Sequence, residues 1–312
     1  MPPTIGIDVG GTKVLGVALD ARGAVIDEHR VLNGRGADGV QGAIDAVYGE
    51  LAARVPTADA VGVGIAGLVD FAGHMRYGPN LPEVLVLPVR EHMEQLSARP
   101  VSVDNDANTA GYGELLYGAA RGTSDALLVT LGTGIGGAII ANGAIYRGAN
   151  GFAAEIGHFT LDRSGPICAC GERGHWEAMA SGTALGRMGA DFVASGRGAA
   201  IAKVAAGAPV TGVHVGAAAA AGDAGALAVL DEFADNVALG LAALSNILDP
   251  ELIMIGGGLV GLGALLFTPL EAAFRAHLEG TQYRNVIRVV PAALGERAGA
   301  IGAAAQAAEL VA

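Results

Sequence analysis

The sequence predicts an α/β fold of two related domains that face a shared cleft. One pattern of strand, glycine loop, strand, turn and strand occurs twice along the chain. Such an internal repeat indicates two related halves, each of which presents one glycine loop to a common ligand. The length of 312 residues agrees with this organisation, because it suits two domains of ordinary size.

The first copy of the pattern opens the chain. Its parts are a strand from Thr4 to Asp8, the loop Gly10-Gly11-Thr12, a strand from Val14 to Leu19, a turn from Asp20 to Gly23 and a strand from Ala24 to Val31. Because glycines lack bulk, the consecutive N–H groups of Gly10 and Gly11 can point at phosphate oxygens. The Thr12 hydroxyl is a further donor, so this loop is predicted to bind phosphate.

Two charged residues flank this loop, and each has two interpretations. Lys13 could contact a phosphate, or it could be a solvated charge at a strand edge. Asp8 could hold a hydrated Mg2+, or it could form a turn. We favour magnesium at Asp8, because a pair of glycines follows it closely.

The second copy of the pattern begins near the middle of the chain. Its parts are a strand from Ala126 to Leu131, the loop GTGIGG from Gly132 to Gly137, a strand from Ala138 to Ala141, the turn Asn142-Gly143 and a strand from Ala144 to Arg147. Gly132, Thr133 and Gly134 are predicted to bind phosphate as the first loop does. GTGIGG also fits the dinucleotide fingerprint, with Glu155 about where the ribose acid would lie. We reject that interpretation, because the fingerprint needs a helix after the loop and this sequence continues as a strand, an Asn-Gly turn and a strand.

A third glycine cluster lies nearer the C-terminus. A strand from Glu251 to Ile255 leads into Gly256, Gly257 and Gly258, and a helix is predicted to follow. Glycines at a helix start can approach a nucleotide closely, so this segment is predicted to contact a nucleotide base or phosphate. The alternative is a tight turn without a ligand.

The segment SVDNDANTAGYGELLYG is predicted to pass from a strand into a helix. Asn105, Asp106 and Asn108 lie at this junction. Asp106 is the candidate general base, which would accept a hydroxyl proton while that oxygen attacks a phosphorus atom. Asn105 would orient the substrate, and Asp104 is expected to be structural. The alternative for Asp106 is helix capping alone.

The loop from Glu155 to Glu177 contains the only two cysteines of the chain and two histidines. His158, Cys168, Cys170 and His175 could bind one zinc ion in a tetrahedron, and an ion with four protein ligands would be structural. Two reduced cysteines beside two surface histidines are the alternative, whereas a Cys168–Cys170 disulfide would close a small strained ring. Glu155, His158 and Glu177 could also contact vicinal sugar hydroxyls. If one His158 ring nitrogen binds zinc, the other is held as a donor toward the substrate.

Charge and composition limit the possible partners. The chain has 19 Lys and Arg against 31 Asp and Glu, a formal charge of -12. This balance disfavours nucleic acids and anionic membranes as partners. The N-terminus shows no signal-peptide pattern, and glycines interrupt every apolar stretch, so a cytoplasmic location is expected.

Six motifs, in this order, resemble the ROK family of sugar kinases: DVGGTK, DNDAN, LGTGIGG, EIGH, CACGERGHWE and IGGG. They cover nearly the whole chain. The resemblance implies the two-domain actin-like ATPase (ribonuclease H-like) fold with an interdomain cleft. It also implies ATP and Mg2+ as cofactors, a structural Zn2+, a sugar substrate, and a homodimer or dimer of dimers.

The resemblance also implies roles for the residues that match family motifs. Asp106 matches the catalytic base. The positions that match hexose contacts are Gly67 in VGIAGLVD, Asn80 in GPNLP, Asn105, Glu155, His158 and Glu177. The glycine loops at Gly10 and Gly132 and the cluster at Gly256 match ATP-binding segments.

The chain departs from the family pattern at one zinc ligand. His175 stands where the family usually has cysteine, so the expected set has two sulfurs and two nitrogens. Because zinc accepts either set, we expect the site to survive with altered affinity. The family also contains sugar-responsive repressors with a helix-turn-helix ahead of the kinase-like body. With three residues before the first predicted strand, no such module is expected here.

The predicted domains are a small α/β domain at residues 1–106, joined by the C-terminal helix at 296–312, and a large domain at 107–295 that carries the zinc loop. The predicted activity is transfer of the ATP γ-phosphoryl group to the 6-hydroxyl of glucose. The alternatives are a kinase for mannose, fructose, N-acetylglucosamine or N-acetylmannosamine, or a sugar sensor without catalysis. Polyphosphate is a less favoured donor, because the chain has no basic run.

Overall fold

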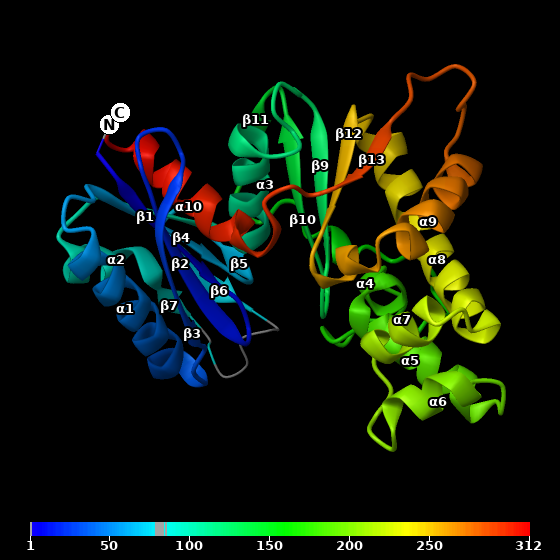
Figure 1. The fold of residues 1–312 in the computed structure, drawn as a ribbon. Coiled ribbons are helices and arrows are strands. Elements are labelled where there is room, and N and C mark those ends of the chain that lie inside the picture. The colour runs from blue at the N-terminus through cyan, green and yellow to red at the C-terminus, as the bar shows by residue number, and fades with distance from the viewer. Residues whose placement is uncertain (1, 79–83, 85) are drawn as a thin grey trace. The chain divides into compact units, whose positions relative to one another are not determined.

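The computed structural model describes residues 2–78, 84 and 86–312, which form two compact units (Figure 1). Unit 1 consists of Met1–Leu128, Gly137–Ala154 and Ala292–Ala312, and unit 2 consists of Val129–Gly136 and Glu155–Pro291. The chain therefore passes from one unit to the other within two strands of one sheet. The folding domains at residues 1–106 and 107–295 remain a prediction.

Unit 1 is built on a five-stranded sheet with the order β3-β2-β1-β4-β8. Its strands are β1 (Thr4–Val9), β2 (Lys13–Leu19), β3 (Val25–Leu32), β4 (Ala60–Ile65) and β8 (Val101–Asn105). β1, β4 and β8 run parallel, and β2 and β3 complete the sheet as antiparallel strands. The three strands predicted at the N-terminus are thus confirmed, and Asp8 and Asn105 both lie at carboxyl ends of parallel strands.

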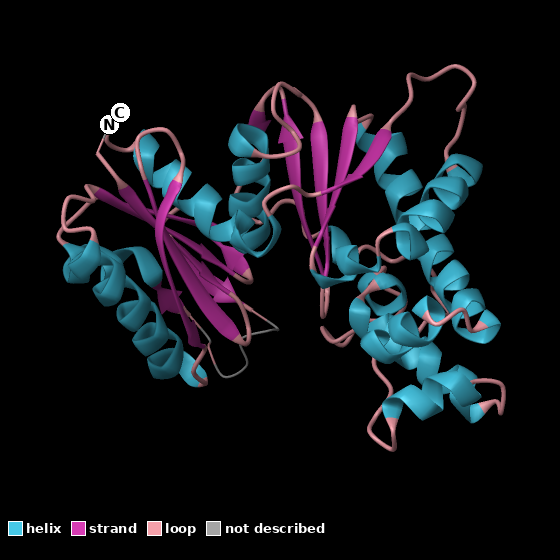
Figure 2. Ribbon diagram, in the orientation of Figure 1, coloured by secondary structure: helices cyan, strands magenta, loops and turns pink. Residues whose placement is uncertain are grey.

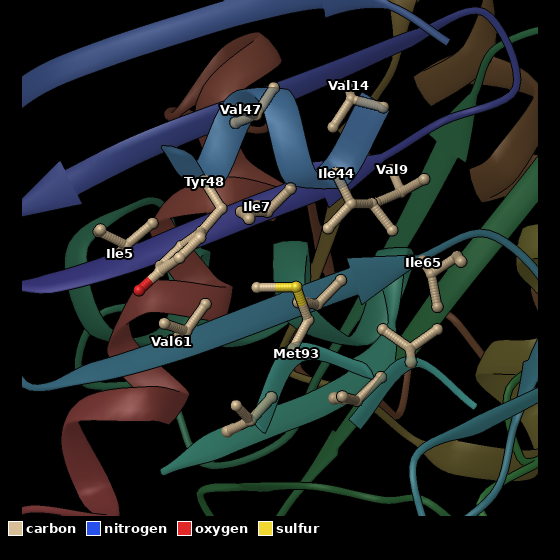
Figure 3. Close-up of a cluster of buried hydrophobic side chains, with 14 of the residues drawn as sticks. Ile5, Ile7, Val9, Val14, Ile44, Val47, Tyr48, Val61, Ile65 and Met93 are labelled. Carbon is tan, nitrogen blue, oxygen red and sulfur yellow. The ribbon is translucent and has the colours of Figure 1, made fainter. Parts of the chain in front are cut away.

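Helices cover both faces of this sheet (Figures 1 and 2). α1 (Gly36–Arg54) and α2 (Val89–Ser97) lie on one face, and α3 (Asp106–Tyr117) and α10 (Ala298–Glu309) lie on the other. Ile5, Ile7 and Val9 alternate along β1 and are buried against α1, as Figure 3 shows. A three-stranded sheet of β5 (Leu68–Val69), β6 (His74–Tyr77) and β7 (Leu87–Pro88) completes the unit.

Helix α10 lies directly on the backbone of the sheet and of α3. A Cβ atom at Gly6 would come 2.0 Å from the Ala300 carbonyl oxygen, and one at Gly302 would come 1.7 Å from the Thr109 carbonyl oxygen. Any side chain at these positions would therefore push the helix away. The predicted packing of the last helix against the N-terminal strands is confirmed.

A second sheet has the order β11-β10-β9-β12-β13. Its strands are β9 (Ala126–Leu131), β10 (Ile135–Ala141), β11 (Ala144–Ile145), β12 (Leu252–Gly256) and β13 (Arg288–Pro291). The strand after the glycine loop turns at Asn142 and Gly143, which both have positive φ, as a two-residue hairpin requires. This hairpin confirms the rejection of the dinucleotide fingerprint.

Unit 2 carries the remaining helices. They are α4 (Glu177–Ala180), α5 (Gly182–Ala194), α6 (Ala199–Ala205), α7 (Gly212–Ala220), α8 (Ala224–Leu248) and α9 (Ala264–His277), with 3-10 turns η1 (Ile156–His158) and η2 (Gly258–Leu262); η3 (Gly295–Arg297) precedes α10 in unit 1. The helix predicted after the glycine cluster is present as the 3-10 helix η2, which begins at Gly258, followed by α9 from Ala264. Gly263 between them has a φ of 54°, which an α-helix cannot contain. Among the described residues, no helix combines the length and apolarity that a membrane span requires.

Candidate functional site

Two carboxylates lie at the carboxyl end of the parallel strands in unit 1. Asp8 is the only half-buried residue in the otherwise buried strand β1, one residue before its end, and Asp106 is the first residue of α3. Burial raises the pKa of Asp8 to about 7, with a further contribution from the negative charge of Asp106 and an opposing one from Lys13. Burial also raises the pKa of Asp106. The two predicted residues are therefore neighbours, and together they form a site of concentrated negative charge.

Asn105 fixes the start of α3 beside this pair. Its side-chain oxygen accepts hydrogen bonds from Ala107 N at 2.8 Å and Asn108 N at 3.1 Å, and its Nδ2 donates to Gly67 O at 3.0 Å. Asn105 is thus an N-cap that also connects the helix to Gly67, which is predicted to contact the sugar. Gly67 has a φ of 121°, and a Cβ there would lie 2.3 Å from Tyr77 O, so only glycine fits.

Asp104, expected to be structural, is the centre of a buried hydrogen-bond network. Its Oδ1 accepts from Asn105 N at 2.8 Å and Asn108 Nδ2 at 3.0 Å. Its Oδ2 accepts from Arg147 Nε at 2.8 Å and Gln306 Nε2 at 3.0 Å. These partners come from β8, α3, α10 and the segment after β11, so the network fixes the strand that delivers Asp106.

The first glycine loop turns tightly, with Gly10 N donating to Lys13 O at 3.0 Å. Gly11 and Thr12 are exposed. Lys13 Nζ donates to Glu296 Oε2 at 2.9 Å, and Arg30 shares the same oxygen. Its predicted phosphate contact would require this exposed ion pair to open, which costs little.

The second glycine loop in unit 2 is held by Glu177, a predicted hexose contact. Glu177 Oε2 accepts from Ile135 N at 2.9 Å, and a Cβ at Gly134 would lie 2.2 Å from that oxygen. The loop also holds the start of α5, because Gly182 N donates to Gly132 O at 2.7 Å and Thr183 Oγ1 donates to Thr133 O at 2.7 Å. Glu177 therefore shapes the backbone predicted to bind phosphate.

A cavity of about 740 Å3 in unit 2 joins two of the three glycine segments. Gly132 and Thr133 line it together with Gly258. The neighbouring Gly257 has a φ of 84°, and a Cβ there would lie 2.4 Å from Leu131 O. The predicted ATP segments of this unit therefore meet around one space of nucleotide size.

Sequence reasoning missed most of the wall of this cavity. Thr183, Arg187, Thr211 and Leu259 also line it. The sequence did offer one signal for this wall, namely Ser181 at the start of α5. Its side-chain oxygen caps the helix by accepting a hydrogen bond from Ala184 N at 3.2 Å. A Ser-Gly-Thr sequence opening a helix is typical of an exposed backbone N–H group that can bind an anion.

The four predicted metal ligands converge. One ligand atom from each of His158, Cys168, Cys170 and His175 lies within 4.8 Å of the others. Cys170 Sγ lies 3.2 Å from His175 Nδ1, and Cys168 Sγ lies 3.8 Å from His158 Nδ1. A tetrahedral zinc ion with bonds of about 2.0 to 2.3 Å would hold its ligands roughly 3.3 to 3.8 Å apart. The residues present therefore fit this metal.

His158 connects this cluster to Glu155. Its Nδ1 faces Cys168, whereas its Nε2 lies 3.9 Å from Glu155 Oε2. The two ring nitrogens thus point to different groups, as the sequence predicted for a histidine that is both a ligand and an oriented donor. Asn80, also predicted to contact the sugar, lies outside the described residues.

Two α/β units, each with a glycine loop, and half-buried carboxylates at the end of β1 and the start of α3 define an actin-like ATPase class of fold. The chain belongs to the ROK family, whose sequence pattern matches residues 4–309. It is 36% identical over 308 residues to a glucokinase of Streptomyces coelicolor, with 96% of each chain covered. The predicted family and fold class are confirmed.

Solved structures agree with this assignment. A ROK family glucokinase from Streptomyces griseus, in complex with glucose and AMPPNP, has a TM-score of 0.89 and 36% identity, covering 98% of this chain and 99% of that one. The ROK hexokinase from Thermus thermophilus has a TM-score of 0.82 and 33% identity, covering 99% of both chains.

The Asp104 network yields a stability prediction. Arg147→Gln should lower the free energy of unfolding by about 1 to 3 kcal/mol, because a buried carboxylate oxygen loses its charged donor. Urea denaturation at pH 7 measures this change. Arg121→Gln, at an exposed arginine, is the matched control and should stay within about 0.5 kcal/mol of the wild type. Equal effects for the two variants would contradict the role of the network.

The raised pKa of Asp8 yields a pH prediction. Since the folded-state pKa of about 7 exceeds the ordinary 3.8, the folded protein binds the proton more tightly, and stability falls as pH rises between these values. Asp8→Asn removes this penalty. The variant should therefore gain several degrees of thermal midpoint over the wild type at pH 8 and less at pH 5, in magnesium-free buffer. A gain that is independent of pH would contradict the assignment.

Proposed function

We propose that this protein is a glucokinase that transfers the γ-phosphoryl group of ATP to the 6-hydroxyl of glucose. The observation that carries the proposal is Asp106, a half-buried carboxylate with a raised pKa at the capped start of α3, in a chain that aligns almost end to end with glucokinases. A carboxylate whose pKa is raised by burial, at a capped helix start, is suited to accept the hydroxyl proton.

The proposed reaction is a single displacement at phosphorus. Asp106 accepts the 6-hydroxyl proton as that oxygen bonds to the γ-phosphorus, and the bond to the β-phosphate bridging oxygen breaks to release ADP. The backbone N–H groups of Gly10 to Thr12 and of Gly132 to Gly134 would bind phosphate oxygens, and Gly256 to Gly258 would approach the nucleotide.

Asp8 would hold the hydrated Mg2+ of the ATP complex. Two neighbouring carboxylates with raised pKa values leave uncompensated negative charge, which a divalent cation offsets. When bound, the ion would neutralise charge on the transferred phosphoryl group. Lys13 would add a further phosphate contact once released from Glu296.

The proposed hexose contacts are Gly67, Asn80, Asn105, Glu155, His158 and Glu177. Asn105 and Glu177 already hold backbone groups at 2.8 and 2.9 Å, so their contribution includes shaping the loops around the sugar. A structural zinc ion held by His158, Cys168, Cys170 and His175 would fix the orientation of the His158 ring.

We further propose a cytoplasmic homodimer or dimer of dimers. The proposal of association rests on membership of the ROK family, whose resemblance implies a homodimer or dimer of dimers.

The base assignment is tested by Asp106→Asn. The variant should lose turnover by about a thousandfold or more, because general-base catalysis contributes up to about 10^4-fold and the proton has no other acceptor. Glucose binding, measured by isothermal titration, should remain within a few-fold of the wild type. Asp125→Asn, a carboxylate that accepts from Asn142 N at 3.2 Å, is the control and should retain activity. Loss of glucose binding as severe as the loss of turnover would oppose the assignment.

The metal assignment is tested by zinc content. Purified protein should carry about one zinc per chain, and Cys170→Ser should reduce the zinc content and lower the thermal midpoint. Prolonged exposure to a strong chelator should destabilise the wild type more than the variant. Ser164→Ala, in the same loop but outside the ligand set, is the control. Wild-type protein free of zinc with full stability would refute the site.

A further inference from the structure

The cavity in unit 2 has an unusual wall for a site that would bind a nucleotide base. Most of its surface comes from glycine and aliphatic residues, including Leu131, Val210, Val213 and Leu259. The polar side chains on the wall are three threonines and one arginine: Thr133, Thr183, Thr211 and Arg187. The described wall contains no side-chain amide and no carboxylate.

Most of these polar groups are already engaged. Thr183 Oγ1 donates to Thr133 O at 2.7 Å. Thr211 Oγ1 lies 3.3 Å from His214 Nδ1 in the capping box of α7. Arg187 Nη2 donates to Ala178 O at 2.9 Å, and Nη1 lies 3.7 Å from Asp191 Oδ2 in an exposed ion pair that can open at little cost.

Adenine and guanine differ on one edge of the purine. Adenine offers an amino donor at N6 and an acceptor at N1, whereas guanine offers an acceptor at O6 and donors at N1 and N2. Asn, Gln, Asp and Glu side chains can tell these edges apart, because they pair with one pattern and repel the other. A threonine hydroxyl can donate or accept, and an arginine donor can bind N7, which both purines share.

We propose that the protein accepts purine nucleoside triphosphates as a class, so that GTP and ITP donate the phosphoryl group nearly as well as ATP. This inference rests on the proposed kinase function and extends its donor range. A site that reads hydrogen bonds rejects an analogue by about 10^4-fold, whereas an apolar pocket discriminates far less. The purine is held here by apolar contacts. The glycine loops hold the phosphates, and all three donors carry the same triphosphate.

The test compares ATP, GTP and ITP at saturating glucose and magnesium, with glucose 6-phosphate formation as the common readout. The expected kcat/KM for GTP and for ITP lies within about tenfold of that for ATP, in line with a pocket without edge-specific pairing. A larger loss for either nucleotide overturns the proposal. No turnover with ATP would instead refute the kinase function. In that case, the dissociation constants of AMPPNP and GMPPNP from thermal-shift titrations decide the donor range by the same tenfold limit.

Arg187→Gln provides a second test. If Arg187 contacts only atoms that the purines share, the variant changes kcat/KM for ATP and GTP by the same factor. A change in the ATP-to-GTP ratio of more than tenfold would show that Arg187 reads the base edge and would overturn the proposal. Arg197→Gln is the matched control in the same unit, because Arg197 stacks 4.6 Å from the Phe192 ring centroid and does not line the cavity. The Arg197→Gln variant should leave kcat/KM unchanged for both ATP and GTP.

Discussion

The close backbone contact that glycines allow between α10 and its neighbours is the constraint on which unit 1 depends. Gly6 and Gly62 let the helix rest on the backbone of β1 and β4, where a Cβ would come within 2.0 Å and 1.8 Å of helix carbonyl atoms. Gly302 brings α3 equally close, and a Cβ at Gly299 would lie 2.7 Å from Asp8 Cγ. This backbone contact holds the strand that carries Asp8 and the helix that carries Asp106 at a fixed separation. Larger residues here would move both carboxylates.

In unit 2, Glu177 plays the corresponding part through hydrogen bonds. One of its oxygens accepts from Ile135 N, and the other lies 3.4 Å from Cys168 Sγ. The preceding Trp176 is fully buried and donates from Nε1 to Asn236 O at 2.9 Å, which anchors the loop to α8. The cysteine and histidine cluster is therefore joined through Glu177 to the second glycine loop. A metal in that cluster would act on the site through position alone, because four protein ligands leave no open coordination place.

The sequence predicted those features whose residues are close together along the chain. The glycine loops, the strand-to-helix junction at Asp106 and the four ligands between His158 and His175 are local patterns with a direct geometric meaning. Thr183 and Arg187 could not be found in this way, because they reach the cavity only after α5 packs against Gly132. The break between η2 and α9 was not predicted for a local reason instead, since Gly263 adopts a positive φ that its identity permits but does not require.

In the proposed reaction, the structure positions the carboxylates near the proton more strictly than it defines the cavity for the nucleotide. The carboxylates are fixed by capping, burial and the Asp104 network, because a proton acceptor must meet one hydroxyl oxygen within hydrogen-bond distance. The wall of the cavity in unit 2 would recognise the purine of the nucleotide mainly by its shape. The purine lies away from the reacting phosphorus, so it would contribute binding energy without reacting. A kinase that fixes the position of its general base, Asp106, but recognises the nucleotide donor less strictly would therefore lose little rate. On the proposed mechanism, selectivity would therefore depend on the residues predicted to contact the sugar hydroxyls, where each unpaired polar group would be costly.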